Sequence, residues 1–582
     1  MEWNKKNIDT DLVREIAGRF NLSLLTASIL VRRGITDFKE IQFYLEDDLQ
    51  FAHSPFHFSE MEDAVDRILT AIEEGEKALV FGDRDVDGIT ATVLMVEELE
   101  KLGLDVRWAV PMGDEPYGLS VKAVQSFAEE DGTLIITVDC GISNSKEIEY
   151  AQSLGIETIV IDHHNPKDEI PNAVAIINPK MEDEGYPFRD LAGCAVAAKV
   201  IWALEFAQTD LYGVPVCLLN IHPDNQTYAL EAIKIVNLME VDRIYENVVP
   251  GVVGFDNTRL GSFFSQQLFA YDSEMQERML KEIFGPDILV ELTDVAPELW
   301  KEFPALREKS LLQMREMSKA VKYSSTQPQE IDILKNIFDL LVTRKYAALS
   351  AEYLEKMDLV ALGTLADMMP LNSENRILVR SGLNVINERP RRGLRELLFR
   401  QNLMGKILGT IDIAWNISPL INATGRMGVP EKAITLFLSD DDEARERLAD
   451  EIFRLNKERK KLGDSAWDRI LPEANKSYEE FEGKLVFVKD NTIHRGVTGI
   501  IASRLLKYFR TTSLVVSAMD NIAFGSLRSV RGFDVKWFLE KCSAYFTDYG
   551  GHDFAAGFNM EQDNVALFEQ EAKKIVKQMK AP

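Results

Sequence analysis

The stretch ALVFGDRDVDGITATVLMVEELEKLG, residues 78–103, joins an apolar run to an amphipathic segment through a loop of alternating aspartates. The run ALVF is short and apolar, as in a buried strand, and the residues after the loop repeat their apolar positions at helical spacing. A strand followed by a helix is the repeating unit of a mostly parallel sheet. We therefore expect the loop at 82–88 to lie at the carboxyl edge of such a sheet, where sites usually form.

The same alternation continues after this stretch. Apolar runs occur in DVRWAVP, TLIITVD, ETIVIDHH and VAIINP, with helical segments such as NSKEIEYAQSLG between them. Three of the runs end in an acid, at Asp83, Asp139 and Asp162. The pattern predicts an α/β fold with helices on both faces of a parallel sheet. Another apolar run, DLVALGTLADMMPL (358–371), predicts a further strand that ends near Asp367.

Composition limits the class of protein. The 582 residues carry a formal net charge of −28, which opposes binding to phosphates unless a cation fills a clustered acidic site. No apolar run reaches 18 residues and the N-terminus lacks an apolar signal region, so neither a membrane span nor a signal peptide is expected. The four cysteines form no CxxC pair, which favours the cytoplasm.

The loop at 82–88 is a candidate metal site. Asp83, Asp85 and Asp87 alternate, and like charges this close are costly without a cation. An EF-hand is excluded, because position 12 counted from Asp83 is Leu94 rather than glutamate. A solvated acidic turn remains the alternative for this loop considered alone.

Two further motifs carry metal-binding chemistry. Asp162 precedes the pair His163 and His164, a mixture of carboxylate and imidazole that suits manganese or a related metal. Taken singly, Asp139 could be only a helix cap, and the histidines could be ordinary surface residues. If the strands are neighbours, the acids converge on one edge and bind two divalent ions, Mn²⁺ or Mg²⁺, that hydrolyse a phosphoester.

The motifs GDRDVDG, TVDCG, DHH and GTLADMMPL, in this order, resemble the four motifs of the DHH phosphoesterase family. The segments AWNISPLINATGRMG, HRGVTGIIASRL, GSLRSVRGFD and YGGHDFAAGF resemble the connector and C-terminal module of its RecJ exonucleases. The resemblance covers about 20–200 and 350–560. It implies a metal-dependent 5′–3′ exonuclease that releases mononucleotides from single-stranded DNA in repair and recombination.

The resemblance also implies domains. We expect a helical layer (1–75), a catalytic domain in two parts (76–204 and 346–400) and a helical connector (401–483). A smaller α/β substrate-binding domain would follow (484–582), with the site in the cleft between the two domains. The acidic segment 205–345 shows no motif, and it could be an inserted, partner-binding module or a run of surface helices.

The resemblance implies roles for individual residues. The metal ligands would be Asp85, Asp87, Asp139, His163 and Asp367, with Asp139 bridging both ions. His164 would contact the scissile phosphate or assist the leaving group. Asp83 and Asp162 would orient ligands, although Asp83 could also ligate directly. The phosphates of the strand would be held by Asn422, Arg426, Ser526, Arg528 and His552.

Three departures from the family keep two other functions open. The loop 111–119 lacks an arginine that the family usually carries, no OB-fold is expected in the residues after the GGH motif, and 205–345 lengthens the middle of the chain. The first two departures and the acidic charge favour a phosphodiesterase of short oligonucleotides or cyclic dinucleotides. The third possibility is a non-catalytic scaffold of the Cdc45 type, although the complete acidic and histidine set opposes it.

Overall fold

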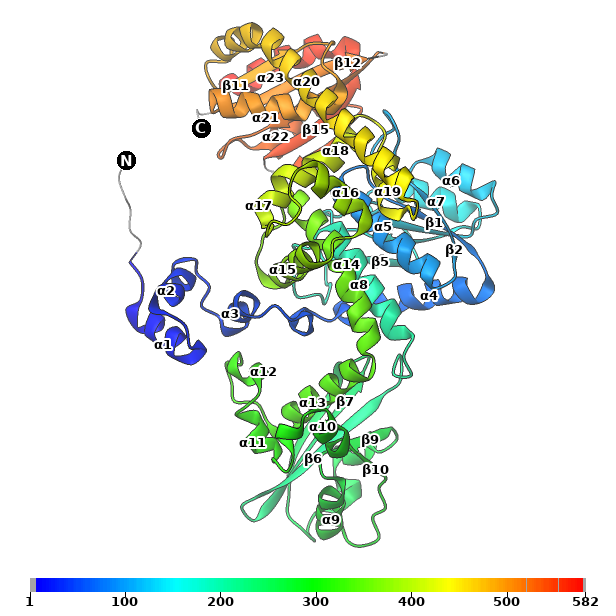
Figure 1. Ribbon diagram of the computed structural model, residues 1–582, viewed down its shortest axis with the longest axis vertical. Helices are drawn as coiled ribbons and strands as arrows, with labels where there is room; N and C mark the ends of the chain where they lie inside the picture. The colour runs from blue at the N-terminus through cyan, green and yellow to red at the C-terminus, as the bar shows by residue number, and fades with distance from the viewer. Residues whose placement is uncertain (1–6, 520, 553, 579–582) are drawn as a thin grey trace.

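The structure, a computed structural model, describes residues 7–519, 521–552 and 554–578 (Figure 1). Residues 1–6 lie outside this range. The prediction that the N-terminus has no signal peptide falls partly on these residues. The described residues form three five-stranded sheets, which follow one another along the chain. Among the described helices, none combines the length and the apolar character needed to cross a membrane.

The first sheet is parallel throughout and confirms the predicted α/β class. Its strand order is β2-β1-β3-β4-β5, so β1, β3 and β4 are direct neighbours. Alternate residues of these strands enter two separate apolar cores, one on each face of the sheet. The strands are β1 (Lys77–Phe81), β2 (Asp105–Ala109), β3 (Leu134–Val138), β4 (Glu157–Ile161) and β5 (Ala175–Ile177). The helices that precede and connect them are α4 (Met61–Glu74), α5 (Val86–Lys101), α6 (Val121–Ala128), α7 (Ser145–Ser153) and α8 (Gly193–Ala207).

The first three helices stand apart from this sheet (Figure 1). They are α1 (Thr10–Phe20), α2 (Leu24–Arg32) and α3 (Phe38–Leu45), and their apolar faces form a cluster of their own. Tyr323 completes that cluster, its ring stacked 5.3 Å from the ring of Phe20. Within the stretch 1–75, therefore, α4 packs against the sheet, α1 contacts the chain near residue 323, and α3 packs against the helix at Ser373–Glu388.

The segment 205–345 contains a sheet that its sequence did not reveal. The strand order is β10-β9-β6-β7-β8, and each face carries its own apolar core. The strands are β6 (Val216–Asp224), β7 (Thr227–Val236), β8 (Met239–Val248), β9 (Gln267–Ala270) and β10 (Leu292–Asp294). Its helices are α9 (Ser273–Phe284), α10 (Ala296–Glu302), α11 (Leu311–Arg315), α12 (Lys319–Lys322) and α13 (Glu330–Lys345). A run of surface helices is thus the wrong interpretation, and this part of the chain is a folded module.

The strand predicted at 358–371 is wrong. Helix α14 (Ala347–Ala366) occupies most of that stretch, and Asp367 is its C-cap. Residues 357–365 are all buried, because α14 packs against α5, α8 and α15 (Ser373–Glu388). A helix that is buried on every side loses its polar stripe, and a short apolar run then cannot be distinguished from a strand by periodicity.

The rest of the chain forms the connector and the C-terminal domain. The connector comprises α16 (Arg392–Arg400), α17 (Thr410–Asp412), a π-helical turn (Ile413–Ile417), α18 (Ser418–Arg426), α19 (Glu431–Leu438) and the long helix α20 (Asp442–Glu480). The third sheet has the order β11-β12-β13-β15-β14 and is mixed. Its strands are β11 (Leu485–Lys489), β12 (Thr512–Met519), β13 (Ile522–Arg528), β14 (Asp548–His552) and β15 (Ala555–Glu561), with α21 (Thr498–Phe509), α22 (Val535–Cys542) and α23 (Val565–Gln578).

Candidate functional site

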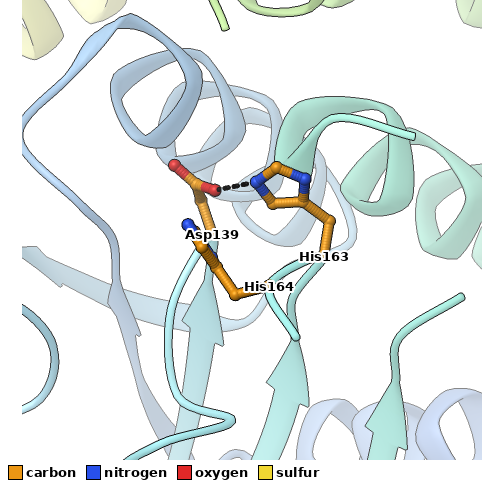
Figure 2. A group of neighbouring side chains, drawn as sticks. All are labelled: Asp139, His163 and His164. Atoms are coloured by element: carbon orange, nitrogen blue, oxygen red, sulfur yellow. Dashed lines mark ion pairs between the residues drawn. The ribbon is translucent and has the colours of Figure 1, made fainter. Parts of the chain in front are cut away.

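The acids at the ends of the parallel strands gather at one edge of the first sheet. Asp83, Asp139 and Asp162 follow β1, β3 and β4, which lie side by side. The end of α14 brings Asp367 to the same edge, where its Oδ2 lies 3.8 Å from Nε2 of His163. Figure 2 shows the ring of His163 directed at Asp139, with 3.1 Å between Nε2 and Oδ1. The predicted convergence therefore occurs, although a helix and not a strand supplies its fourth acid.

The loop after β1 is shaped by its own hydrogen bonds. Asp85 is the N-cap of α5, and its carboxylate accepts hydrogen bonds from the backbone N–H groups of Asp87 (2.9 Å) and Gly88 (3.1 Å). A Cβ at Gly88 would lie 2.6 Å from the backbone of Asp83, so only glycine allows the loop to close this tightly. The turn therefore presents all three aspartates of the motif at the sheet edge.

Helix α8 meets the site at its first residues. The carboxylate of Asp87 accepts hydrogen bonds from the backbone N–H groups of Gly193 (2.6 Å) and Cys194 (2.9 Å), which would otherwise lack partners at the start of a helix. A Cβ at Gly193 would lie 2.6 Å from Oδ1 of Asp139. Sequence reasoning missed Gly193. The signal that could have revealed it is the small-residue run AGCAVAA at a helix start.

Asp162 is occupied with hydrogen bonds to protein groups. It accepts from the backbone N–H groups of Ile142 (3.0 Å), His163 (2.7 Å) and His164 (3.1 Å). Its Oδ1 also lies 2.7 Å from Nδ1 of His164. Burial opposes the charged form of each partner, but this bond outweighs it, so the pKa of Asp162 is lowered and that of His164 is raised to about 9. Asp162 is thus arranged to orient and charge His164.

Several other atoms of the edge lack partners, although Asp85 and Asp87 accept backbone hydrogen bonds. Among buried side-chain atoms of the described residues, Asp83 Oδ1, Asp139 Oδ1 and His163 Nε2 have no hydrogen-bond partner. Burial, followed by repulsion from Asp85, raises the pKa of Asp83 to about 7 and that of Asp87 to about 6. In the described part of the chain, no lysine or arginine forms an ion pair with any acid of this edge. A buried set of this kind needs a cation.

The residues present fit divalent metal ions. Possible ligand atoms within 4.8 Å of one another come from three groups of side chains: Asp83, Asp85 and Asp139; Asp87, His163 and Asp367; and Asp139, His163 and His164. Every predicted ligand belongs to at least one group, and Asp139 and His163 each belong to two; of these, only the carboxylate of Asp139 has two oxygens, as a bridging position requires. Asp83 and His164, predicted for other roles, are also near enough to ligate. Carboxylate oxygens with one or two imidazoles suit manganese and similar metals.

Side chains from the connector and the C-terminal domain lie near this edge. Asn422, on α18, accepts a hydrogen bond from the backbone N–H of Val86 at 3.3 Å. Arg426 is the last residue of that helix. Desolvation by the surrounding protein, followed by the positive charges of Arg459 and Arg528, lowers the pKa of Arg426 to about 10, and the negative charge of Asp85 opposes this shift. The structure therefore groups Asn422, Arg426 and Arg528 near the acidic loop.

Ser526 and Arg528, both on β13, lie beside the start of α21. The Ser526 hydroxyl is 3.0 Å from that of Thr498, and a Cβ at Gly499 would lie 2.9 Å from a guanidinium nitrogen of Arg528. The start of a helix beside an arginine favours an anion. Strand β14 ends at His552, whose backbone pairs with Ala555, the same residue that pairs with Arg528. The side chain of His552 lies outside the described part of the structure.

Sequence reasoning also missed Arg459, on the long helix α20. Its Nη2 and Nε donate to Oδ1 of Asn456, at 2.8 and 3.3 Å, and within the described residues it forms no ion pair with an acid. In the sequence it belongs to NKERKK, which looks like an ordinary charged helix surface. Only its proximity to Arg426 distinguishes it.

The loop 111–119 joins the three parts around the site. Arg84, from the aspartate motif, donates to the carbonyl oxygens of Gly113 (3.1 Å) and Pro116 (3.3 Å). The N–H of Gly113 donates to the Gly428 carbonyl oxygen (2.9 Å) in the connector. Arg495, before α21, donates to the Asp114 carbonyl oxygen (2.8 Å). A loop without the family's arginine therefore holds the first sheet against the connector and the C-terminal domain.

Comparison with protein families and curated proteins gives two domains and a set of relatives. Residues 77–219 match the DHH family, N-terminal domain, and residues 482–578 match the DHHA1 domain. The single-stranded-DNA-specific exonuclease RecJ of Bacillus subtilis (strain 168) is 27% identical over 97% of this chain and 54% of its own length. The RecJ of Escherichia coli (strain K12) is 27% identical over 95% of this chain and 74% of its own length. The chain thus spans about half of the first relative and about three quarters of the second.

Solved structures agree on the fold. RecJ from Thermus thermophilus in complex with Mn²⁺ has a TM-score of 0.64 and 23% identity, covering 99% of this chain and 62% of that one. A second structure, exonuclease RecJ bound to manganese, has a TM-score of 0.57 and 24% identity, covering 90% of this chain and 96% of that one. Asp367, Asn422 and Arg426 lie outside both matched domains, so their place at the site rests on the geometry alone.

Proposed function

We propose that this chain, a RecJ-like protein with DHH and DHHA1 domains, is a metal-dependent phosphodiesterase that degrades single-stranded DNA from its 5′ end to mononucleotides. The observation that carries the proposal is the buried edge where Asp83, Asp139 and His163 present atoms without partners. Such an edge is unfavourable until a cation fills it. Relatives that are single-stranded-DNA-specific exonucleases support the substrate class.

The metal ions would be Mn²⁺ or Mg²⁺. Two of them would polarise the phosphate and activate the attacking water. The ligand groups around Asp139 support a pair of ions that share it. The residues proposed to hold them are Asp85, Asp87, Asp139, His163 and Asp367, with Asp83 near enough to contribute.

His164 is proposed to serve the leaving group. Its Nδ1 faces Asp162 at 2.7 Å, which keeps the imidazole protonated at neutral pH and leaves Nε2 as the donor toward the substrate. The Tyr117 hydroxyl lies 3.2 Å from the same Nδ1 and donates to the Asp139 carbonyl oxygen at 3.0 Å, which restricts the ring further. His164 thus gains a fixed direction and a proton.

The opposite side of the site is proposed to hold the strand's phosphates. Arg426, Arg528 and Ser526 supply charge and hydrogen-bond donors, and neither arginine is paired with an acid in the described residues. His552 stays a prediction from its motif. Changing Arg426 or Arg528 to alanine should weaken binding and flatten its salt slope by about one unit per lost contact. An unchanged slope, measured by binding titrations at several salt concentrations, would contradict the assignment.

A phosphodiesterase of short oligonucleotides or cyclic dinucleotides is the second candidate. The hydrogen bonds of Arg84, Gly428 and Arg495 to the loop 111–119 favour it, since they restrict the space beside the metal-binding edge. The net charge of −28 also weakens affinity for long strands. A non-catalytic scaffold is disfavoured, because unpaired buried acids would destabilise such a protein without benefit.

One assay separates these candidates. The protein with Mn²⁺ or Mg²⁺ receives 5′-phosphorylated long single-stranded DNA, the same strand labelled at its 3′ end, a dinucleotide, a cyclic dinucleotide and duplex DNA. Early release of mononucleotides from the 5′ end, with the 3′ label retained in long products, supports the exonuclease. Turnover restricted to the short substrates supports the second candidate, and binding without turnover supports the scaffold. The variant Asp139→Ala should be inactive on every substrate, which controls for a contaminating nuclease.

The wider role follows from the same proposal. Removal of nucleotides from a 5′ end would serve DNA repair and recombination, and all four cysteines are free and buried, in keeping with the predicted cytoplasmic location. The folded module at 205–345 remains the proposed place for a protein partner.

A further inference from the structure

One face of the helical segment 410–426 carries exposed side chains at Ile411, Trp415 and Arg426, with half-buried residues between them. From α17 through the π-helical turn to α18, the residues Ile411, Trp415, Pro419, Asn422 and Arg426 recur every three or four positions. This spacing places them on one side of a helix. Ile411 and Trp415 are each 71% exposed, which is unusual for large apolar side chains.

The far end of this face belongs to the site already described. Asn422 contacts the backbone of Val86, between Asp85 and Asp87, and Arg426 lies near Arg528. Trp415 precedes Asn422 by seven residues, which corresponds to about 10 Å along a helix axis. An extended strand whose phosphates reach Asn422 and Arg426 can therefore pass over Trp415.

Packing within the fold does not explain the aromatic ring of Trp415. Among the described residues no aromatic ring packs against it, and the exposed indole lies outside every apolar core. The turn that carries it is held from behind, where Gln401 Nε2 donates to the Asn416 carbonyl oxygen at 2.9 Å. The ring thus stands on a fixed backbone with its surface free.

Charge favours nucleic acid as the occupant of this face. Asp412 is engaged in capping, since its carboxylate accepts from the backbone N–H of Gly409 at 2.9 Å. Lys406, in the preceding loop, is exposed and forms no ion pair in the described part of the chain. An exposed aromatic ring on the same helix face as Arg426, which forms no ion pair with an acid in the described residues, has the composition of a single-strand binding track. A protein partner would require no continuity with the phosphate side chains.

We propose that Trp415 is a stacking platform for a base of the single-stranded substrate, outside the nucleotide that is cleaved. The proposal rests on the proposed function and names a binding residue that lies outside both matched domains and has no role among the residues assigned above. Stacking does not distinguish one base from another. The platform would therefore strengthen the binding of longer strands without selecting a base sequence.

The test is binding of fluorescent oligothymidylates of increasing length, by anisotropy, to full-length protein that carries Asp139→Asn so that the strand survives. In that background, Trp415→Ala should weaken binding of the long oligonucleotide by about 5- to 100-fold and reduce the gain in affinity with length. Trp415→Phe should restore most of it. Tyr245→Ala is the matched control, since Tyr245 is 47% exposed on β8 in another sheet, and it should bind as the parent does.

The outcomes distinguish a failure of the stacking platform from a failure of the proposed exonuclease function. If the parent binds no single strand of any length, the proposed function fails, and the platform with it. If the parent binds with a length-dependent affinity and Trp415→Ala matches it, only the platform is refuted. Equal thermal midpoints of the Trp415→Ala and Trp415→Phe variants assign a difference in binding to the ring and not to misfolding. A phenylalanine variant as weak as the alanine variant would also refute stacking.

Discussion

Two acidic clusters lie at opposite ends of the same three helices, and only one of them is neutralised by protein. The site cluster gathers where α5 and α8 begin and α14 ends, and it comprises Asp83, Asp85, Asp87, Asp139 and Asp367. The structural cluster gathers where α5 and α8 end, beside the first half of α14, and it comprises Glu98, Glu205, Glu352, Lys101 and Lys356. Both contain buried carboxylates, so burial does not separate them.

The difference lies in the cations. In the structural cluster, Nζ of Lys356 is 2.8 Å from Glu98, and Nζ of Lys101 is 3.5 Å from Glu98 and 3.6 Å from Glu205. The site cluster has no lysine or arginine in an ion pair within the described residues. Buried acids with lysines stabilise a fold, whereas buried acids without them indicate a site that binds its cation from solution.

The largest expected effect concerns α14, which carries Glu352 and Lys356 of the structural cluster and ends at Asp367 of the site cluster. Asp367→Asn should lower turnover by about 1000-fold, because losing a metal ligand removes about 4 kcal/mol of transition-state stabilisation. Glu352→Gln, on the same helix, is the matched control and should stay within a few-fold of the wild type. Steady-state turnover rates of both variants check this prediction, measured on the substrate that the wild type cleaves fastest in the assay proposed above. Equal rates for both variants would erase the distinction between the clusters.

Loss of a lysine tests the structural cluster. Lys356→Met leaves Glu98 buried beside fewer cations and should lower the free energy of unfolding by about 3 kcal/mol, with or without Mn²⁺. Urea unfolding measures it, and adding Glu98→Gln to the same chain should recover part of the loss. A change below about 1 kcal/mol would mean that water already screens this pair.

Metal should stabilise only through the site cluster. Mn²⁺ at 100 times its dissociation constant should add about 2.7 kcal/mol to the free energy of unfolding. The rise in thermal midpoint should persist in Glu205→Gln and disappear in Asp139→Asn. A chelator should reverse it. The same rise in both variants would place the bound ion elsewhere.

The smallest effect is a dependence on pH. Burial, with Glu98 adding to it, raises the pKa of Glu205 from an ordinary 4.5 to about 7. The folded chain then binds this proton more tightly than the unfolded chain, so the contribution to stability falls as pH rises from 4.5 to about 7. Glu205→Gln should therefore be more stable than the wild type by about 1 to 2 kcal/mol at pH 8 and equal to it near pH 4. An equal difference at both pH values, in urea unfolding, would contradict this cause.

Much of the site could be predicted because it follows short-range rules. Asp83, Asp139 and Asp162 each end an apolar run, and the parallel strand order then makes them neighbours. Asp85 caps the helix that its own motif begins. Motif resemblance added His163 and the connector residue Asn422, whose side chain reaches the loop after β1.

The parts that could not be predicted depend on contacts distant in the chain. The second half of α14, residues 357–365, is buried on all sides and lacks the polar stripe that would have marked it as a helix. The role of Gly193 exists only because Asp139, 54 residues earlier, packs against it. The strands of 205–345 carry no chemical motif, and their pairing became visible only in the sheet.

The amino-acid sequence by itself determined where strands end in acids, where α5 begins and which residue types could bind metal, because these depend on neighbours within a few positions. The tertiary structure alone decided which acids remain without a cation and that Arg459 joins Arg426 and Arg528. It also placed Trp415 on one helix face with Asn422. Electrostatic pairing and exposure are set by distances in space, which a linear pattern does not contain.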